Sequence, residues 1–129
     1  MSVNSNFAIA QQTTKPSRAL NLTIWGVQIL AALAFLAAGG SKLSSAPAMV
    51  DMFQKIGLGQ WFRYLTGSLE VLGSLLLLLP RTASIGGWLL AAVMIGAIGT
   101  HLFIIGGSPI PAAVLLALAI MIGWNRSKR

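Results

Sequence analysis

Four long apolar runs dominate the pattern of hydrophobic and polar positions. They cover about residues 22–42, 61–79, 82–105 and 109–124. A helix needs about 20 residues, within a range of about 17–25, to cross a hydrocarbon core ~30 Å thick. The fourth run is short on this count, so we expect it to borrow residues at both ends. The pattern predicts an all-α integral membrane protein, a four-helix bundle.

More polar segments flank these runs. Residues 1–20 predict a flexible N-terminal tail, residues 21–125 the four-span transmembrane domain, and residues 126–129 a basic C-terminal tail. Lys15 and Arg18, followed by the first apolar run, raise the alternative of a signal peptide. That run is longer than the usual ~7–15 apolar residues of a signal peptide, so we favour a membrane span.

The connector between the first two runs has the periodicity of a short amphipathic helix. Its apolar positions recur at helical spacing and are Met49, Met52, Phe53 and Ile56. Polar residues fall between them, and Gly57 ends the stretch. We expect this helix to lie flat at the outer membrane interface or to cover the mouth of the bundle.

Composition agrees with membrane residence and excludes several kinds of chemistry. Of the 129 residues, 56% are hydrophobic and 9% are charged, whereas about 25% of a soluble domain is charged. The chain has no cysteine, which excludes disulfides, thiolate nucleophiles and thiolate-bound zinc or iron–sulfur clusters. One His and two acids are too few for a closed metal site. We therefore expect any redox cofactor on another polypeptide, or a diffusible lipid-soluble molecule.

The net charge of +7 is spread at the ends of the apolar runs. This placement indicates contact with anionic lipid rather than with nucleic acid. With four spans, both termini and the second connection share one side of the membrane. That side carries six basic residues, Lys15, Arg18, Arg81, Arg126, Lys128 and Arg129, and the other carries three, Lys42, Lys55 and Arg63. The positive-inside rule then predicts that both termini are cytoplasmic.

Glu70 lies within the second apolar run. A charged carboxylate at such a depth costs about 2.5–3.5 kcal/mol, so we expect it to face protein or water. It belongs to a stripe of polar and small residues at helical spacing: Arg63, Thr66, Gly67, Glu70, Gly73 and Ser74. A second such face in the first run is formed by Gln28, Ala31, Ala32, Phe35, Gly39 and Lys42.

We therefore predict a polar pocket in the outer half of the bundle, with Lys42, Arg63, Glu70 and His101 as candidate residues. Three interpretations stay open: an ion pair that locks two helices together, a proton- or quinone-facing site, and an ion or solute path. His101 projects from the side of its helix opposite the small residues. The argument for a functional role is therefore weakest for His101. We expect close helix packing at Gly39, Gly40, Gly67, Gly73 and Gly96.

Several of these segments together resemble the DoxX family of small bacterial membrane proteins. The resemblance covers about residues 22–124. It rests on the segments 35–43, 52–58 and 69–73, which read Phe-Leu-Ala-Ala-Gly-Gly-Ser-Lys-Leu, Met-Phe-Gln-Lys-Ile-Gly-Leu and Leu-Glu-Val-Leu-Gly, and on Pro80-Arg81 and His101. In the first segment, either Gly39 or Gly40 can match the glycine of the family's Gly-x-x-Lys element.

The resemblance implies a four-helix fold in the bacterial inner membrane. Some members are subunits of quinone-linked thiosulfate oxidoreductases, and others join membrane complexes for defence against oxidative stress. We therefore expect a subunit that is not catalytic alone and that works with a membrane redox partner protein, with quinone as the candidate ligand. The alternatives are a small proton-coupled transporter, which would function as a homo-oligomer, and a purely structural partner protein.

Overall fold

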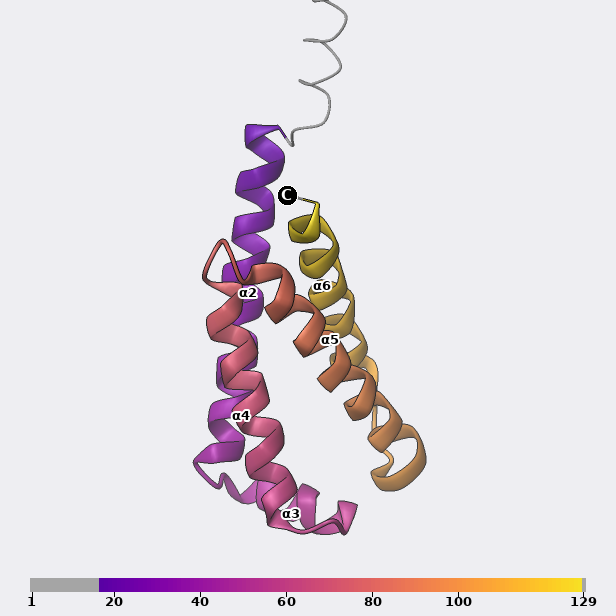
Figure 1. Ribbon diagram of the computed structural model, residues 1–129. Helices are drawn as coiled ribbons and strands as arrows, with labels where there is room; N and C mark the ends of the chain where they lie inside the picture. The colour runs from indigo at the N-terminus through magenta and orange to yellow at the C-terminus, as the bar shows by residue number, and fades with distance from the viewer. Residues whose placement is uncertain (1–16, 129) are drawn as a thin grey trace, which may run out of the picture.

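Long helices separated by short connections make up the fold. The computed structural model describes residues 17–128 and contains no strand in that range. The elements are α2 (Arg18–Leu43), α3 (Pro47–Ile56), α4 (Gln60–Leu77), α5 (Ala83–Thr100), the π-helical turn η1 (His101–Ile105) and α6 (Ile110–Ser127) (Figure 1). The predicted all-α membrane bundle of four long helices and one short amphipathic helix is confirmed.

Three segments are long and apolar enough to cross a membrane: Arg18–Leu43, Ala83–Ile105 and Ile110–Ser127. Within the described range α4 does not join this set, and it is the helix that carries Arg63 and Glu70. It still packs between α2 and α5 as the fourth long helix. Its charged groups are turned inward, which is how a helix with two ionisable residues can sit in a bilayer.

The ends of the bundle differ from the expected boundaries. Residues 1–16 of the predicted N-terminal tail lie outside the described part of the chain, but residues 18–20 are already helical. The Ser17 hydroxyl accepts a hydrogen bond from the Leu20 amide (3.0 Å) and caps α2 there. The predicted C-terminal tail is also wrong in part, because α6 continues through Ser127 and Arg126 is buried.

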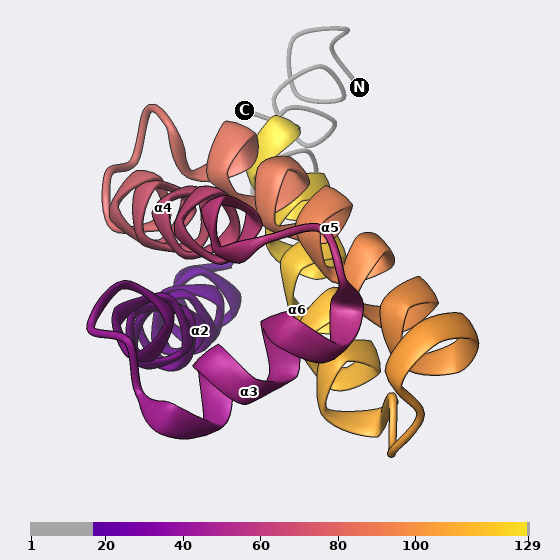
Figure 2. The same cartoon turned by 90° about the horizontal axis from the view of Figure 1, so that it is seen from below.

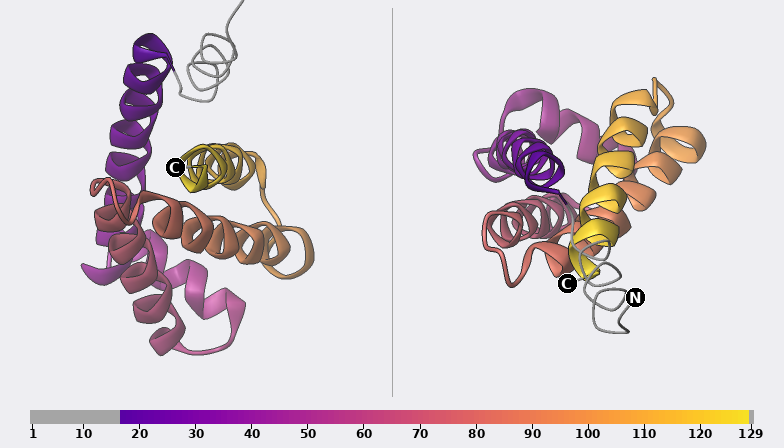
Figure 3. Two further views of the ribbon diagram at one scale, coloured as in Figure 1. Left: turned by 45° about the horizontal axis from the view of Figure 1, so that its top comes forward. Right: turned by 90° about the horizontal axis from the view of Figure 1, so that it is seen from above.

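Consecutive long helices run in opposite senses, and α5 crosses α4 obliquely (Figure 1). Helix α2 packs against α4, α4 against α5, and α5 against α6. The pair α2/α4 and the pair α5/α6 diverge toward one end, where α3 crosses from one pair to the other (Figures 1 and 2). We call this the α3 end. At the opposite end the start of α2 and the end of α6 lie on the same side of the molecule (Figure 3).

The core is built from the helix faces that the sequence pattern marks out. Its buried residues are Ala31, Ala32, Phe35, Leu77, Leu90, Ala91, Met94, Ala112, Ala119 and Ile122. Most of the lipid-compatible side chains on the other faces remain exposed, as expected for helices that meet acyl chains rather than water. Two of these core residues, Met94 and Ala112, also line the cavity at the α3 end.

Glycines set the closest approaches between helices. A Cβ on Gly39 would lie 2.8 Å from the carbonyl oxygen of Gly67, and a Cβ on Gly87 would lie 2.6 Å from the amide nitrogen of Gly123. Any larger residue would force the backbones apart. A Cβ on Gly73 would lie 2.6 Å from the Leu90 side chain, which covers this glycine.

Two of the glycines that we expected at close helix contacts do not lie at such a contact. A Cβ on Gly40 or Gly96 would meet nothing within 4 Å. Gly40 is adjacent in sequence to Gly39 but is rotated about 100° around the helix axis, away from α4. In α5, the face that packs inward carries Leu90 and Met94 rather than the small residues around Gly96.

A buried polar network joins the helices at the end opposite α3. The Gln28 amide donates a hydrogen bond to the Leu77 carbonyl oxygen (2.8 Å) and accepts one from Arg126 Nε. Arg126 Nη1 also donates to the Asn21 side-chain oxygen (2.8 Å), and its guanidinium lies 5.2 Å from the centre of the Trp25 ring. This network ties α6 and α4 to α2.

Candidate functional site

An ion pair between α2 and α4 lies at the centre of the candidate site. Lys42 Nζ is 2.8 Å from Glu70 Oε1. The Glu70 side chain is 1% exposed and that of Lys42 is 14% exposed. Glu70 lies beside Gly39 of the other helix, where a Cβ would be 3.1 Å from Glu70 Cβ. Lys42 lies beside Gly67, where a Cβ would be 2.9 Å from Lys42 Cβ. The close approach of the backbones therefore brings the two charges together.

The second carboxylate oxygen of Glu70 is buried, and no described residue hydrogen-bonds to it. Among residues 17–128, Glu70 Oε2 has no hydrogen-bond partner. An unsatisfied buried acceptor costs free energy, so such a group calls for an explanation. Glu70 also lines a cavity, but water does not reach Oε2 in this conformation, so a donor in the cavity reaches this atom only if the side chain turns.

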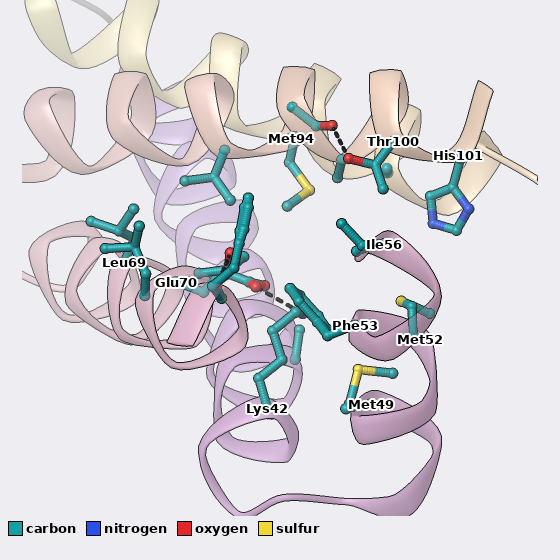
Figure 4. Close-up of a pocket in the computed structure, with 18 of the residues that line it drawn as sticks. Lys42, Met49, Met52, Phe53, Ile56, Leu69, Glu70, Met94, Thr100 and His101 are labelled. Atoms are coloured by element: carbon teal, nitrogen blue, oxygen red, sulfur yellow. Dashed lines mark hydrogen bonds and ion pairs between the residues drawn. The ribbon is translucent and has the colours of Figure 1, made fainter. Parts of the chain in front are cut away.

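The cavity has a volume of about 370 Å³ and lies at the α3 end of the bundle. All four long helices, α3 and η1 contribute to it. Its walls are mainly apolar, and the residues labelled in Figure 4 are Lys42, Met49, Met52, Phe53, Ile56, Leu69, Glu70, Met94, Thr100 and His101. An apolar chamber with a few polar groups is typical of a small-molecule site.

Helix α3 closes one side of the cavity. Its four apolar positions, predicted from their helical spacing, all line the cavity, while Asp51, Gln54 and Lys55 are exposed. The Phe53 ring packs edge-on against Phe62 of α4, with 5.9 Å between ring centres. Gly57, with a φ of 85°, ends the helix in the left-handed conformation that glycine tolerates best. We expected α3 either to lie flat at the membrane interface or to cover the mouth of the bundle. In the structure it covers the mouth of the bundle.

His101 lies on the other side of the cavity from the ion pair (Figure 4). It is the first residue of the π-helical turn that extends α5. Its Nδ1 is 3.0 Å from the carbonyl oxygen of Gly106, in the loop that follows. Such π-helical turns occur frequently at functional sites, where they redirect a side chain from the regular helical path.

Arg63 does not line the cavity, contrary to the prediction. Its Nη1 donates hydrogen bonds to the Lys42 carbonyl oxygen and to Ser45 Oγ (3.0 Å), and its Nε donates to Gln60 Oε1 (2.7 Å). The guanidinium thus caps the carbonyl end of α2, where a positive charge is favourable. Arg63 holds the turn between α2 and α3 in place, and within residues 17–128 it is Lys42 that pairs with Glu70.

Sequence reasoning missed two parts of this arrangement. The first is the contribution of α6 to the cavity, through Pro111, Ala112 and Leu115. The second is the buried Arg126 at the far end of the bundle. A signal for Arg126 exists, because it continues the buried face of Ala119, Ile122 and Gly123 at helical spacing. Among the described residues no group of His, Asp and Glu is arranged to hold a metal ion.

Comparison with known proteins adds one decisive observation. The model of the DoxX-like family matches residues 26–123, which is most of the chain and includes every residue of the ion pair and cavity named above. The chain belongs to the DoxX-like family. No curated protein and no solved structure matches it. Membership of the DoxX-like family agrees with the helical membrane fold, and the chemistry has to be argued from the cavity itself.

Proposed function

We propose that this DoxX-like protein is a non-catalytic membrane subunit of a quinone-linked oxidoreductase system. The cavity at the α3 end would hold the quinone head group. One observation carries the proposal: an ion pair, Lys42 with the buried Glu70, lines a mainly apolar cavity of about 370 Å³. A lipid-soluble ring with polar oxygens needs both an apolar wall and a few fixed polar groups.

The polar groups suit such a ring. An ammonium group has three donor hydrogens, and only one is directed at Glu70 by the ion pair. Lys42 can therefore donate to a ring oxygen while it stays paired. Phe53, Met94 and the other apolar side chains of the cavity offer surface for the flat ring. Because the chain has no cysteine, the electron-carrying groups would reside on a partner protein.

Isolation of the intact complex tests this proposal. The protein would be purified from native membranes in mild detergent, and the eluate analysed for a redox partner and for bound quinone. Glu70→Gln keeps the size of the side chain but removes its charge. We expect the partner to be retained and quinone-dependent activity to fall by at least about tenfold, as when a charged hydrogen-bonding group is lost from a binding site. Ser68→Ala, on the exposed face of the same helix, should leave the activity unchanged.

Two results would contradict the proposal. Full activity of Glu70→Gln in an intact complex would leave the ion pair with a structural role alone. Proton or solute flux through the wild-type protein in liposomes, abolished by Glu70→Gln, would favour a transporter. A transporter needs water to reach Glu70, whose side chain is 1% exposed in this conformation.

We also propose that the protein lies in the bacterial inner membrane with both termini in the cytoplasm. The excess of basic residues on the side of the termini supports this orientation. The lack of native cysteines makes a simple test available, because single cysteines can be introduced at Gln54 and at Ser127, both exposed and at opposite ends. In intact spheroplasts an impermeant maleimide should label Gln54→Cys only. Labelling of Ser127→Cys instead would reverse the orientation.

A further inference from the structure

Glu70 and His101 line the cavity, and each carries an atom that can accept a hydrogen bond. We propose that the site binds the reduced, dihydroxy form of its ring ligand, a quinol, more tightly than the oxidised quinone. This inference rests on the function proposed above and adds to it a preference for one redox state. It follows from the hydrogen-bonding capacity of Glu70 and His101.

Glu70 supplies the first acceptor. Its Oε1 is paired with Lys42 at 2.8 Å, and its Oε2 has no hydrogen-bond partner among residues 17–128. A carboxylate paired with an ammonium group only accepts hydrogen bonds. Glu70 lines the cavity, so a turn of its side chain would present Oε2 to a donor bound there. A hydroxyl group can be that donor, and a carbonyl oxygen cannot.

His101 supplies the second acceptor. Its Nδ1 is 3.0 Å from the Gly106 carbonyl oxygen, and a carbonyl oxygen can only accept. In the neutral ring this contact is a hydrogen bond only when the proton is on Nδ1, which leaves the lone pair on Nε2. The φ of 72° at Gly106 turns the chain sharply after η1 and brings this carbonyl to the ring. Figure 4 shows the imidazole projecting from the turn toward Ile56 of α3.

These acceptors distinguish the two redox states of the ligand. The oxygens of a quinone only accept hydrogen bonds, so they would find a partner at Lys42 but face lone pairs at Glu70 Oε2 and His101 Nε2. The hydroxyl groups of a quinol both donate and accept, so they can satisfy either acceptor. One net hydrogen bond corresponds to about a threefold to tenfold difference in affinity. A tenfold preference for the quinol would raise the two-electron midpoint potential of the bound couple by about 30 mV.

The test uses the full chain in lipid nanodiscs with three probes: decyl benzoquinone, its quinol, and the dimethyl ether of that quinol. The ether keeps the shape of the quinol but has no hydroxyl donor. We expect the quinol to bind about threefold to tenfold more tightly than the other two. Equal affinity of the quinol and its ether would overturn the inference, as would tighter binding of the quinone.

His101→Asn is the matched variant. The asparagine amide can still donate to the Gly106 carbonyl oxygen, as Nδ1 does, but nothing in it replaces Nε2. We expect a loss of about threefold to tenfold in quinol affinity and a change of less than about twofold in quinone affinity. An equal loss for both probes would assign His101 a purely structural role and refute the preference. If neither probe binds the wild-type protein, the proposed function fails together with the inference; if both bind equally, only the inference fails.

Discussion

Gly39 of α2 and Gly67 of α4 meet backbone to backbone, and Glu70 and Lys42 flank this contact. A Cβ on Gly39 would lie 2.8 Å from the Gly67 carbonyl oxygen. This contact controls the separation of the two helices and hence the distance of 2.8 Å between Lys42 Nζ and Glu70 Oε1. Packing and site geometry are therefore coupled at this point, and the coupling can be tested with neighbouring glycines.

Gly39→Ala should destabilise the protein by about 1–3 kcal/mol, because the added methyl group meets backbone that cannot give way locally. Gly40→Ala is the matched control. It adds the same group in the same helix where nothing lies within 4 Å, so it should be neutral or stabilise the helix by up to about 1 kcal/mol. Unfolding in mixed detergent micelles measures both. Equal effects of the two substitutions would show that the α2–α4 contact does not have this geometry.

The ion pair should behave as a coupled unit in a double-mutant cycle. Lys42→Met leaves a buried carboxylate without its cation and should cost on the order of 3 kcal/mol of unfolding free energy. The double variant Lys42→Met with Glu70→Leu removes both charges and should recover most of that loss, since a buried pair replaced by apolar residues is often close to neutral. Additive losses in the double variant would mean that the two side chains do not interact in the membrane.

Arg63→Ala should destabilise the junction of α2 and α3 without changing the cavity directly. The substitution removes charge-assisted hydrogen bonds to the Lys42 carbonyl oxygen and Ser45, and each such bond contributes about 1.5–3 kcal/mol. Arg63→Lys keeps the charge but loses the forked geometry, so it should fall between wild type and alanine. Unfolding and ligand affinity measured side by side check this prediction. A loss of affinity at unchanged stability would place Arg63 in the binding site instead.

Arg126 should anchor the end of α6. Its side chain is 5% exposed and hydrogen-bonds to Gln28 and Asn21 of α2. Arg126→Met keeps much of the length of the chain but breaks this network, and we expect a loss of about 2–4 kcal/mol together with faster proteolysis of the C-terminus. Lys128→Met, two residues later on an exposed side chain, is the control and should have little effect. Similar proteolysis of the two variants would contradict an anchoring role.

The sequence alone determined the helical membrane fold and the inward faces of its helices. Long apolar runs with few charges have few other stable arrangements, because a lipid environment leaves backbone groups to be satisfied within the helix. Helical spacing then marked the buried stripe around Glu70 and the face of α2 that ends at Lys42. It also predicted α3 with its four apolar positions, since the amphipathic pattern is local.

Tertiary structure alone decided which of the polar residues meet. The sequence placed Lys42 and Arg63 in the predicted pocket with Glu70 but did not choose between them, because helical spacing gives a direction around one helix but no distance to another. The register set by Gly39 and Gly67 brings Lys42 to the carboxylate, while the end of α2 engages Arg63. The tautomer of His101 depends on a carbonyl oxygen five residues away across a tight turn, and the burial of Arg126 depends on residues about a hundred positions earlier in the chain. Contacts of this kind arise only when separate helices pack, so no local pattern contains them.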